Sequence, residues 1–90
     1  MHQRRGASLR EWPTGRPAVF VATDAGPTSA RRLAQLGVRS GSTVTPVQRT
    51  PGGGLLLAVA ELRLALDRET VAGMRVQDPE ATRSAGRNSI

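Results

Sequence analysis

Apolar and polar residues alternate over several short stretches of the chain, which is the pattern of strands that bury one face. Five stretches are predicted as strands, either from this pattern or as short continuous apolar runs: residues 17–22, 43–49, 55–60, 62–66 and 74–76. In the fourth stretch, Leu62, Leu64 and Leu66 would all point to one side of a strand, whereas in a helix they would spread over about 200°. The alternation therefore favours a strand there.

Turn residues between these stretches predict how the strands connect. Pro51, followed by three glycines at 52–54, predicts a hairpin between the second and third strands. Pro46 interrupts the second strand and has no amide hydrogen for a ladder, so it implies an edge position or a bulge. A bulge at this point would bring Val44 and Val47 to the same face.

Two short helical pieces are predicted between the strands. Either Thr28 or Ser29 can cap a first helix of about two turns, and Gly37 is placed to end it in a left-handed conformation. Later in the chain, Asp67 can cap a single helical turn that ends at Gly73. The apolar side of the first helix carries four residues: Ala30, Leu33, Ala34 and Leu36.

Within the first helix, Arg31 and Arg32 present an electrostatic conflict. The predicted start would place both in the first turn, where cations oppose the helix macrodipole and cost up to about 1 kcal/mol each at an exposed site. We therefore expect a compensating carboxylate, which either a partner surface or Asp24 or Glu69 of the same chain would supply.

Five short strands and two helical pieces predict a mainly β fold. It would be a small, closed or partly closed barrel of about five strands, with one short helix after the first strand and a helical turn before the last. The 90 residues of the chain leave room for one such domain. The ends are basic and poor in large apolar groups, so we expect the domain at 8–77 between flexible tails at 1–7 and 78–90.

Charge and cysteine content narrow the function. The net charge is +6 and cysteine is absent, which excludes disulfides, thiolate metal clusters and cysteine nucleophiles. No apolar run approaches the roughly 18 to 20 residues that span a bilayer, so we expect a cytoplasmic protein without membrane insertion. The basic excess would attract phosphate, but Trp12 and Phe20 alone provide few stacking platforms, and a nucleic-acid partner is not expected.

Candidate catalytic and metal-binding residues are sparse. The serines have no plausible histidine base, because the one histidine is His2, near the start of the chain. Asp67 and Glu69 are two residues apart, which does not place them on one helix face, and the other carboxylates are scattered singly. We predict no enzyme activity, no catalytic residue, no metal site and no cofactor.

One combination of motifs resembles a known family. Residues 31–41 read Arg-Arg-Leu-Ala-Gln-Leu-Gly-Val-Arg-Ser-Gly, and a glycine hairpin and a Leu-Ala-Leu strand follow at the corresponding intervals. The chain thereby resembles the FeoA proteins, small accessory components of bacterial ferrous iron transport, over residues 8–77. Further matching positions are Val44, Val47, Leu64, Ala65, Leu66, Ala72 and Val76, with Leu9, Gly15 and Ala18 at the opening.

The resemblance implies an SH3-like barrel without catalytic activity that binds and modulates the cytosolic part of FeoB, a membrane permease with a GTPase domain. Leu33 and Leu36 share a helix face, for which core packing is the default interpretation. The residues predicted to contact the partner are Arg31, Arg32, Leu36 and Arg39.

Two alternatives remain open at this stage. Similar domains form the C-terminal part of metal-dependent transcriptional repressors, so the chain is alternatively an SH3-like module that associates with nucleic acid through its basic ends, with affinity that falls steeply with salt. A general peptide-binding module is a weaker alternative, because the aromatic groove used for proline-rich ligands is missing. Self-association through a barrel edge is also left open.

Overall fold

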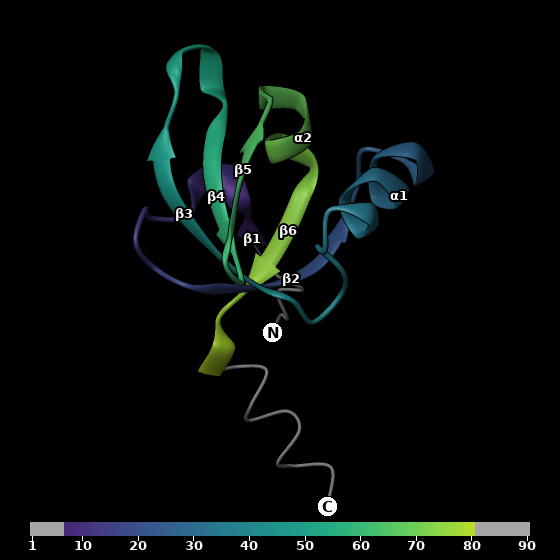
Figure 1. Ribbon diagram of the computed structural model, residues 1–90, viewed down its shortest axis with the longest axis horizontal. Helices are drawn as coiled ribbons and strands as arrows, with labels where there is room; N and C mark the ends of the chain where they lie inside the picture. The colour runs from purple at the N-terminus through teal and green to yellow at the C-terminus, as the bar shows by residue number, and fades with distance from the viewer. Residues whose placement is uncertain (1–6, 81–90) are drawn as a thin grey trace, which may run out of the picture.

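The computed structural model describes residues 7–80, which form one six-stranded antiparallel sheet with two short α-helices (Figure 1). In chain order the elements are β1 (Ala7–Ser8), the 3-10 turn η1 (Leu9–Glu11), β2 (Ala18–Thr23), α1 (Pro27–Gln35), β3 (Thr43–Arg49), the 3-10 turn η2 (Pro51–Gly53), β4 (Leu55–Val59), β5 (Leu62–Leu66), α2 (Arg68–Gly73) and β6 (Met74–Gln77).

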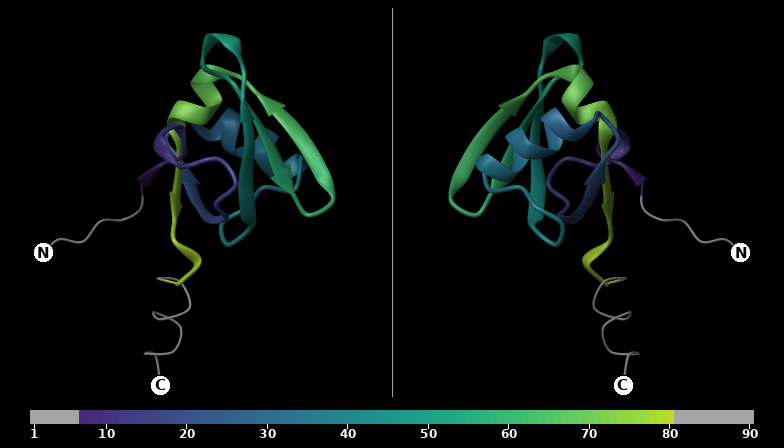
Figure 2. Two further views of the ribbon diagram at one scale, coloured as in Figure 1. Left: turned by 90° about the vertical axis from the view of Figure 1, so that its left-hand side faces the viewer. Right: turned by 90° about the vertical axis from the view of Figure 1, so that its right-hand side faces the viewer.

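The strands lie in the order β1-β6-β2-β3-β4-β5 and form a strongly curved sheet (Figure 2). This confirms the predicted mainly β class with few helices. The five predicted strands are present, and the two-residue β1 adds a sixth by pairing with β6. Among the described residues, the edge strands β1 and β5 do not pair with each other, so the sheet curls without closing.

The bulge predicted at Pro46 is present, but its effect on the core differs from expectation. The register of β3 against β4 shifts between Pro46 and Gln48, which leaves Val47 as the extra residue. Pro46 is fully buried and lies on the core side with Val44, whereas Val47 is only half-buried. The bulge therefore lets an interior strand accept a proline, and the proline itself fills the core.

The hydrophobic core lies within the curve of the sheet and draws side chains from every strand except β1. The turn η1 adds Leu9, which is fully buried, and the adjacent loop adds Trp12. The three alternating leucines of β5 form a strand as predicted, but their burial is graded. Leu66 is buried, Leu64 is half-buried and Leu62 is 57% exposed, because β5 runs outward to its turn with β4.

Helix α1 begins earlier than predicted. Pro27 occupies its first turn and Gly26, with φ of 103°, precedes it, so neither Thr28 nor Ser29 is the cap. Proline suits this position because its ring presets a helical φ and its missing amide hydrogen would be unpaired anyway. The earlier start places Arg32 in the last turn, where a cation is favourable. The predicted conflict with the helix macrodipole is therefore absent.

The end of α1 is as predicted. Gly37 adopts φ of 98°, a left-handed conformation that glycine reaches without strain. Its amide donates to the Ala34 carbonyl at 3.0 Å, and the Val38 amide donates to the Leu33 carbonyl at 2.8 Å. These two bonds form a Schellman motif, and Leu33 and Val38 are both part of the core.

The second helix also follows the sequence prediction. Asp67 precedes α2, and its Oδ1 accepts a hydrogen bond from the Thr70 amide at 2.8 Å. The predicted tails lie largely in 1–6 and 81–90, outside the described residues, and their flexibility stays a prediction. Within the described part, Ala7 pairs in β1 and Asp78 accepts hydrogen bonds at the end of the domain.

Candidate functional site

Helix α1 carries two of the four predicted contact residues, Arg31 and Arg32, and Leu36 follows as its C-cap. One buried side chain anchors the helix to the domain. Leu33 is 1% exposed, whereas Arg31, Arg32 and Gln35 are exposed. In Figure 1 the helix stands to one side of the sheet. Because a single residue seats the helix, it forms a narrow ridge with a groove along each flank.

The Arg32 groove lies between α1 and the junction of β5 with α2 and has a volume of about 100 Å³. Arg32 lines it from the helix, Leu36 from the cap that ends the helix, and Asp67 from the junction. Leu36 is 38% exposed, so the core packing expected by default for this residue is not found. The full lining is Ser29, Arg32, Leu33, Leu36, Ala65, Leu66, Asp67 and Thr70.

Asp67 supplies this groove with its own negative charge. Hydrogen bonding to the Thr70 side chain, and next to the Thr70 backbone amide, lowers the pKa of Asp67, and the nearby Arg32 guanidinium adds a smaller lowering. Asp67 is therefore the carboxylate that lines this groove with Arg32. Among the described ion pairs, neither Asp24 nor Glu69 is joined to Arg31 or Arg32 as expected. Asp24 instead lies 3.4 Å from Arg75.

The Arg39 groove lies on the other flank of α1, against β2, and has a volume of about 330 Å³. Small apolar side chains, Ala30 and Ala34, form its helical wall. The turn that carries Arg39 is braced, because the Arg39 amide donates to Ser42 Oγ at 3.0 Å and that hydroxyl donates to the Gly37 carbonyl at 3.2 Å. The full lining is Phe20, Val21, Ala22, Thr23, Ala30, Ala34, Val38, Arg39 and Ser40.

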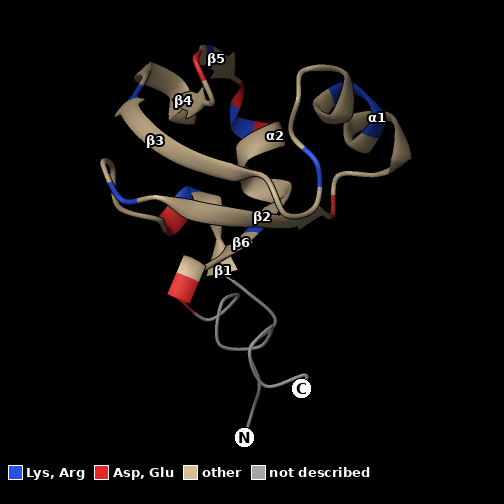
Figure 3. Cartoon of the chain, turned by 60° about the horizontal axis from the view of Figure 1, so that its bottom comes forward, with Lys and Arg blue, Asp and Glu red and all other residues tan. Residues whose placement is uncertain are grey.

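The structure divides the four predicted contact residues between two sides of one ridge. Arg32 and Leu36 line one groove and Arg39 lines the other, while Arg31 lines neither. All four are exposed, and Figure 3 shows the basic positions of α1 and of the following loop at the same end of the molecule. Their role in partner binding stays a prediction.

Sequence reasoning missed the walls that face the helix. Asp67 was identified as a helix cap but not as a neighbour of Arg32, because the two are far apart in the chain and meet only through the fold. The outer part of β2 was identified as a strand but not as a groove wall. One available signal was the pair Ala30 and Ala34, four residues apart, which predicts a strip of small side chains on one helix face.

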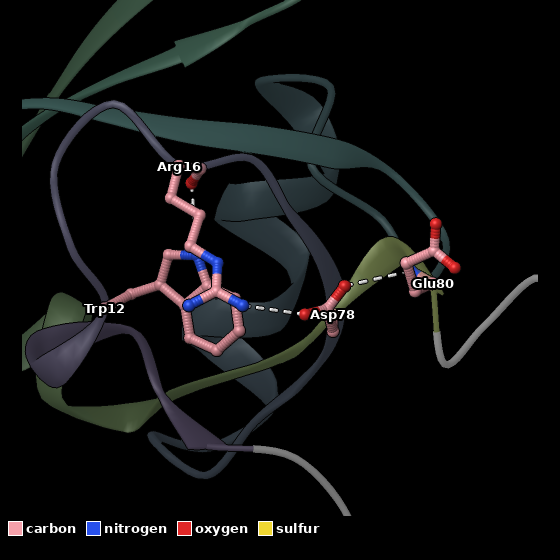
Figure 4. Close-up of polar contacts among 4 residues, drawn as sticks. All are labelled: Trp12, Arg16, Asp78 and Glu80. Carbon is pink, nitrogen blue, oxygen red and sulfur yellow. Dashed lines mark hydrogen bonds and ion pairs between the residues drawn. The ribbon is translucent and has the colours of Figure 1, made fainter.

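A second cluster of polar contacts surrounds Trp12 and has a structural role (Figure 4). The Trp12 indole donates to the Arg16 carbonyl at 3.0 Å, and the Arg16 guanidinium lies 5.0 Å from the centroid of the Trp12 ring. The same guanidinium donates to Asp78 at 2.8 Å, and the Glu80 amide donates to the other Asp78 oxygen at 3.0 Å. These contacts tie the loop before β2 to the segment after β6.

The described residues do not offer a metal centre. Between residues 7 and 80, no group of three or more His, Asp or Glu side chains lies close enough together to hold a metal ion. His2 lies outside this range. No helix in the same range is long and apolar enough to cross a membrane.

Proteins of known structure share this fold, and one of them is described as an SH3 domain protein. FeoA of Stenotrophomonas maltophilia, described as an SH3 domain protein in complex with zinc, is 33% identical, with a TM-score of 0.65 over 79% of this chain and 89% of that one. FeoA of Chlorobium tepidum is 24% identical, with a TM-score of 0.74 over 81% of this chain and 70% of that one.

The family model of the FeoA domain matches residues 7–78, which is most of the chain. The chain therefore belongs to the FeoA family. A manganese-dependent transcriptional repressor shares the fold at 18% identity and a TM-score of 0.75, but only 44% of that protein is covered. No match was found among curated proteins.

Proposed function

We propose that this chain is a non-enzymatic accessory protein of ferrous iron transport that binds the cytosolic part of a FeoB-like GTPase permease and modulates uptake. The observation that carries the proposal is the match to the FeoA domain over residues 7–78. The Stenotrophomonas relative is itself described as a candidate activating factor of ferrous iron transport. The nucleic-acid alternative depends on basic tails that lie mostly outside the described residues, and no contact seen here favours it.

The contact surface in this proposal is the ridge formed by α1 and the turn after it. Arg31, Arg32 and Arg39 are exposed there beside Leu36. Helix α1 has no acidic residue in its first turn. Positive charge would steer an acidic partner to this end of the molecule, while the apolar groove walls would lengthen the residence time. Leu33 on the helix and Val38 in the turn are each 1% exposed and anchor this surface. Its exposed residues can therefore be substituted without disturbing the core.

Titration calorimetry of the full chain against the cytosolic domain of the permease from the same genome tests this proposal. The double variant R31E/R32E is expected to weaken binding by more than about tenfold, or about 1.4 kcal/mol. The matched control is R10E/R63E, which makes the same change in net charge at exposed positions of η1 and β5. Wild-type affinity in R31E/R32E, or equal losses in both variants, would contradict the proposed surface, and no binding by the wild type would contradict the proposed partner.

A further inference from the structure

The Arg39 groove exists because β2 and β3 separate. Their pairing runs from Ala18 opposite Val44 to Val19 opposite Thr43, and two further bonds join Phe20 to the turn before β3. Beyond that point the described part of β2 is paired with β6 but not with β3. Helix α1 crosses at this position and leaves a groove between itself and the end of β2.

The walls of this groove are apolar over most of their length. Val21 and Val38 contribute branched side chains, and Ala30 and Ala34 are too small to fill the space between helix and strand. The volume of about 330 Å³ is within the range of about 300–1,000 Å³ that is typical of ligand sites. The groove is thus large enough to receive an apolar side chain from another molecule.

The lining of the Arg39 groove carries positive charge only. Arg39 is the only charged residue among those that line it, and none of the described ion pairs involves Arg39. At the opposite end, Thr23 is followed by Asp24, whose carboxylate lies 3.4 Å from Arg75. The Arg32 groove differs, because Asp67 already supplies a carboxylate there. An incoming carboxylate therefore finds its better site at Arg39.

We infer that the Arg39 groove is a docking site for an acidic peptide segment in which a large apolar side chain lies next to a carboxylate. The apolar side chain enters between Ala30, Ala34 and Val21, and the carboxylate pairs with Arg39. Burial of the side chain provides the hydrophobic contribution, and the ion pair orients the segment along β2. The inference rests on the proposed function and identifies which flank of α1 holds the partner.

The first test uses end-capped Asp-Asp-Leu-Asp-Asp as the probe and follows the backbone amides of the full chain by NMR. Saturable shifts are expected at the residues that line the Arg39 groove, and not with Lys-Lys-Leu-Lys-Lys or Asp-Asp-Ser-Asp-Asp. A30L should weaken binding at least about fivefold by filling the groove, while Q35L adds the same side chain at an exposed position that lines neither groove. R39E should weaken it similarly, with R63E as its charge-matched control.

Three outcomes of this test would overturn the inference. They are shifts centred on the Arg32 groove, no saturable shift at all, and affinities that A30L and R39E leave unchanged. Shifts of the groove amides with protein concentration alone would also overturn it, by assigning the groove to a second copy of the chain.

The second test repeats the four variants against the cytosolic domain of the permease and separates this inference from the proposed function. If the pentapeptide maps to the Arg39 groove and the permease domain does not bind, the docking site stands and the proposed partner is wrong. If the permease domain binds A30L and R39E as tightly as the wild type, the proposed partner stands and this docking site is wrong.

Discussion

Arg31 and Arg32 are neighbours in sequence but occupy different surroundings. Arg32 lies in the groove that contains Asp67, and its charge contributes to the lowered pKa of that carboxyl group. Arg31 lines neither groove and lies on the exposed ridge. Because exposed charges contribute at most about 1 kcal/mol to stability, substituting either arginine should leave the fold intact.

The lowered pKa of Asp78 predicts that the protein loses stability in acid. The Glu80 amide, and to a smaller extent Arg16, lower the pKa of Asp78 from its ordinary value of 3.8, and hydrogen bonding to Thr70 lowers that of Asp67. A carboxyl group with a lowered pKa in the folded state stabilises the fold above the unfolded pKa, and this contribution is lost as the pH falls through the folded pKa. Stability should therefore decline below about pH 4.

Urea unfolding followed by fluorescence of Trp12, the one tryptophan of the chain, measures this effect between pH 7 and pH 2. D78N should be less stable than the wild type at pH 7 and should lose less stability below pH 4. Neutralising Glu61, an exposed residue of the β4–β5 turn, by E61Q provides the control. Parallel pH profiles for D78N and the wild type would rule out the contribution of Asp78.

At the scale of single elements, the ends of helices and strands are set by close local contacts. Pro27 starts α1 and Gly37 ends it, each through its own backbone preference. Gly54 acts differently, because it has an ordinary φ of −79° but no space beside it. A Cβ at this position would lie 2.5 Å from Thr50 Oγ1 and 2.7 Å from the Leu66 carbonyl oxygen. The hairpin between β3 and β4 can approach the end of β5 only because residue 54 lacks a side chain.

Gly54→Ala is accordingly expected to destabilise the protein by about 1–3 kcal/mol, the usual range for overpacking. Equilibrium urea unfolding gives the difference in the free energy of unfolding. Removing the Thr50 hydroxyl in T50A/G54A should restore only part of the loss, because the obstructing Leu66 carbonyl belongs to the backbone. Full recovery in the double variant would show that the side-chain contact alone matters.

At the scale of the whole molecule, the curved sheet decides which apolar residues support the fold and which are free for contact. Leu57 lies on β4, between β3 and β5, and is fully buried, whereas Leu62 lies on the edge strand β5 and is 57% exposed. Leu57 belongs to the continuous apolar run at 55–60, and Leu62 begins the alternating run at 62–66. Their difference in burial arises because β4 lies between two strands, whereas β5 is at the edge of the sheet.

Leu57→Ala is expected to destabilise the protein by about 2–5 kcal/mol, through lost burial and the cavity left behind. Leu62→Ala should change the free energy of unfolding by no more than about 0.5 kcal/mol, as is usual for exposed positions. Thermal unfolding monitored by circular dichroism compares the two variants directly. A large loss in L62A would show that the β5 edge is covered in solution, for example by a second copy.

The sequence by itself determined the strands through their apolar patterns and the glycine hairpin. It also determined the end of α1 through Gly37 and the second helix through the Asp67 cap. These features depend on residues that are close together in the chain. The sequence also carried the FeoA motifs. Only the tertiary structure showed that β1 adds a sixth strand, that Pro46 is buried in place of Val47, and that Asp67 lies beside Arg32. It alone showed the two grooves, since their walls come from segments that meet only when the sheet curls.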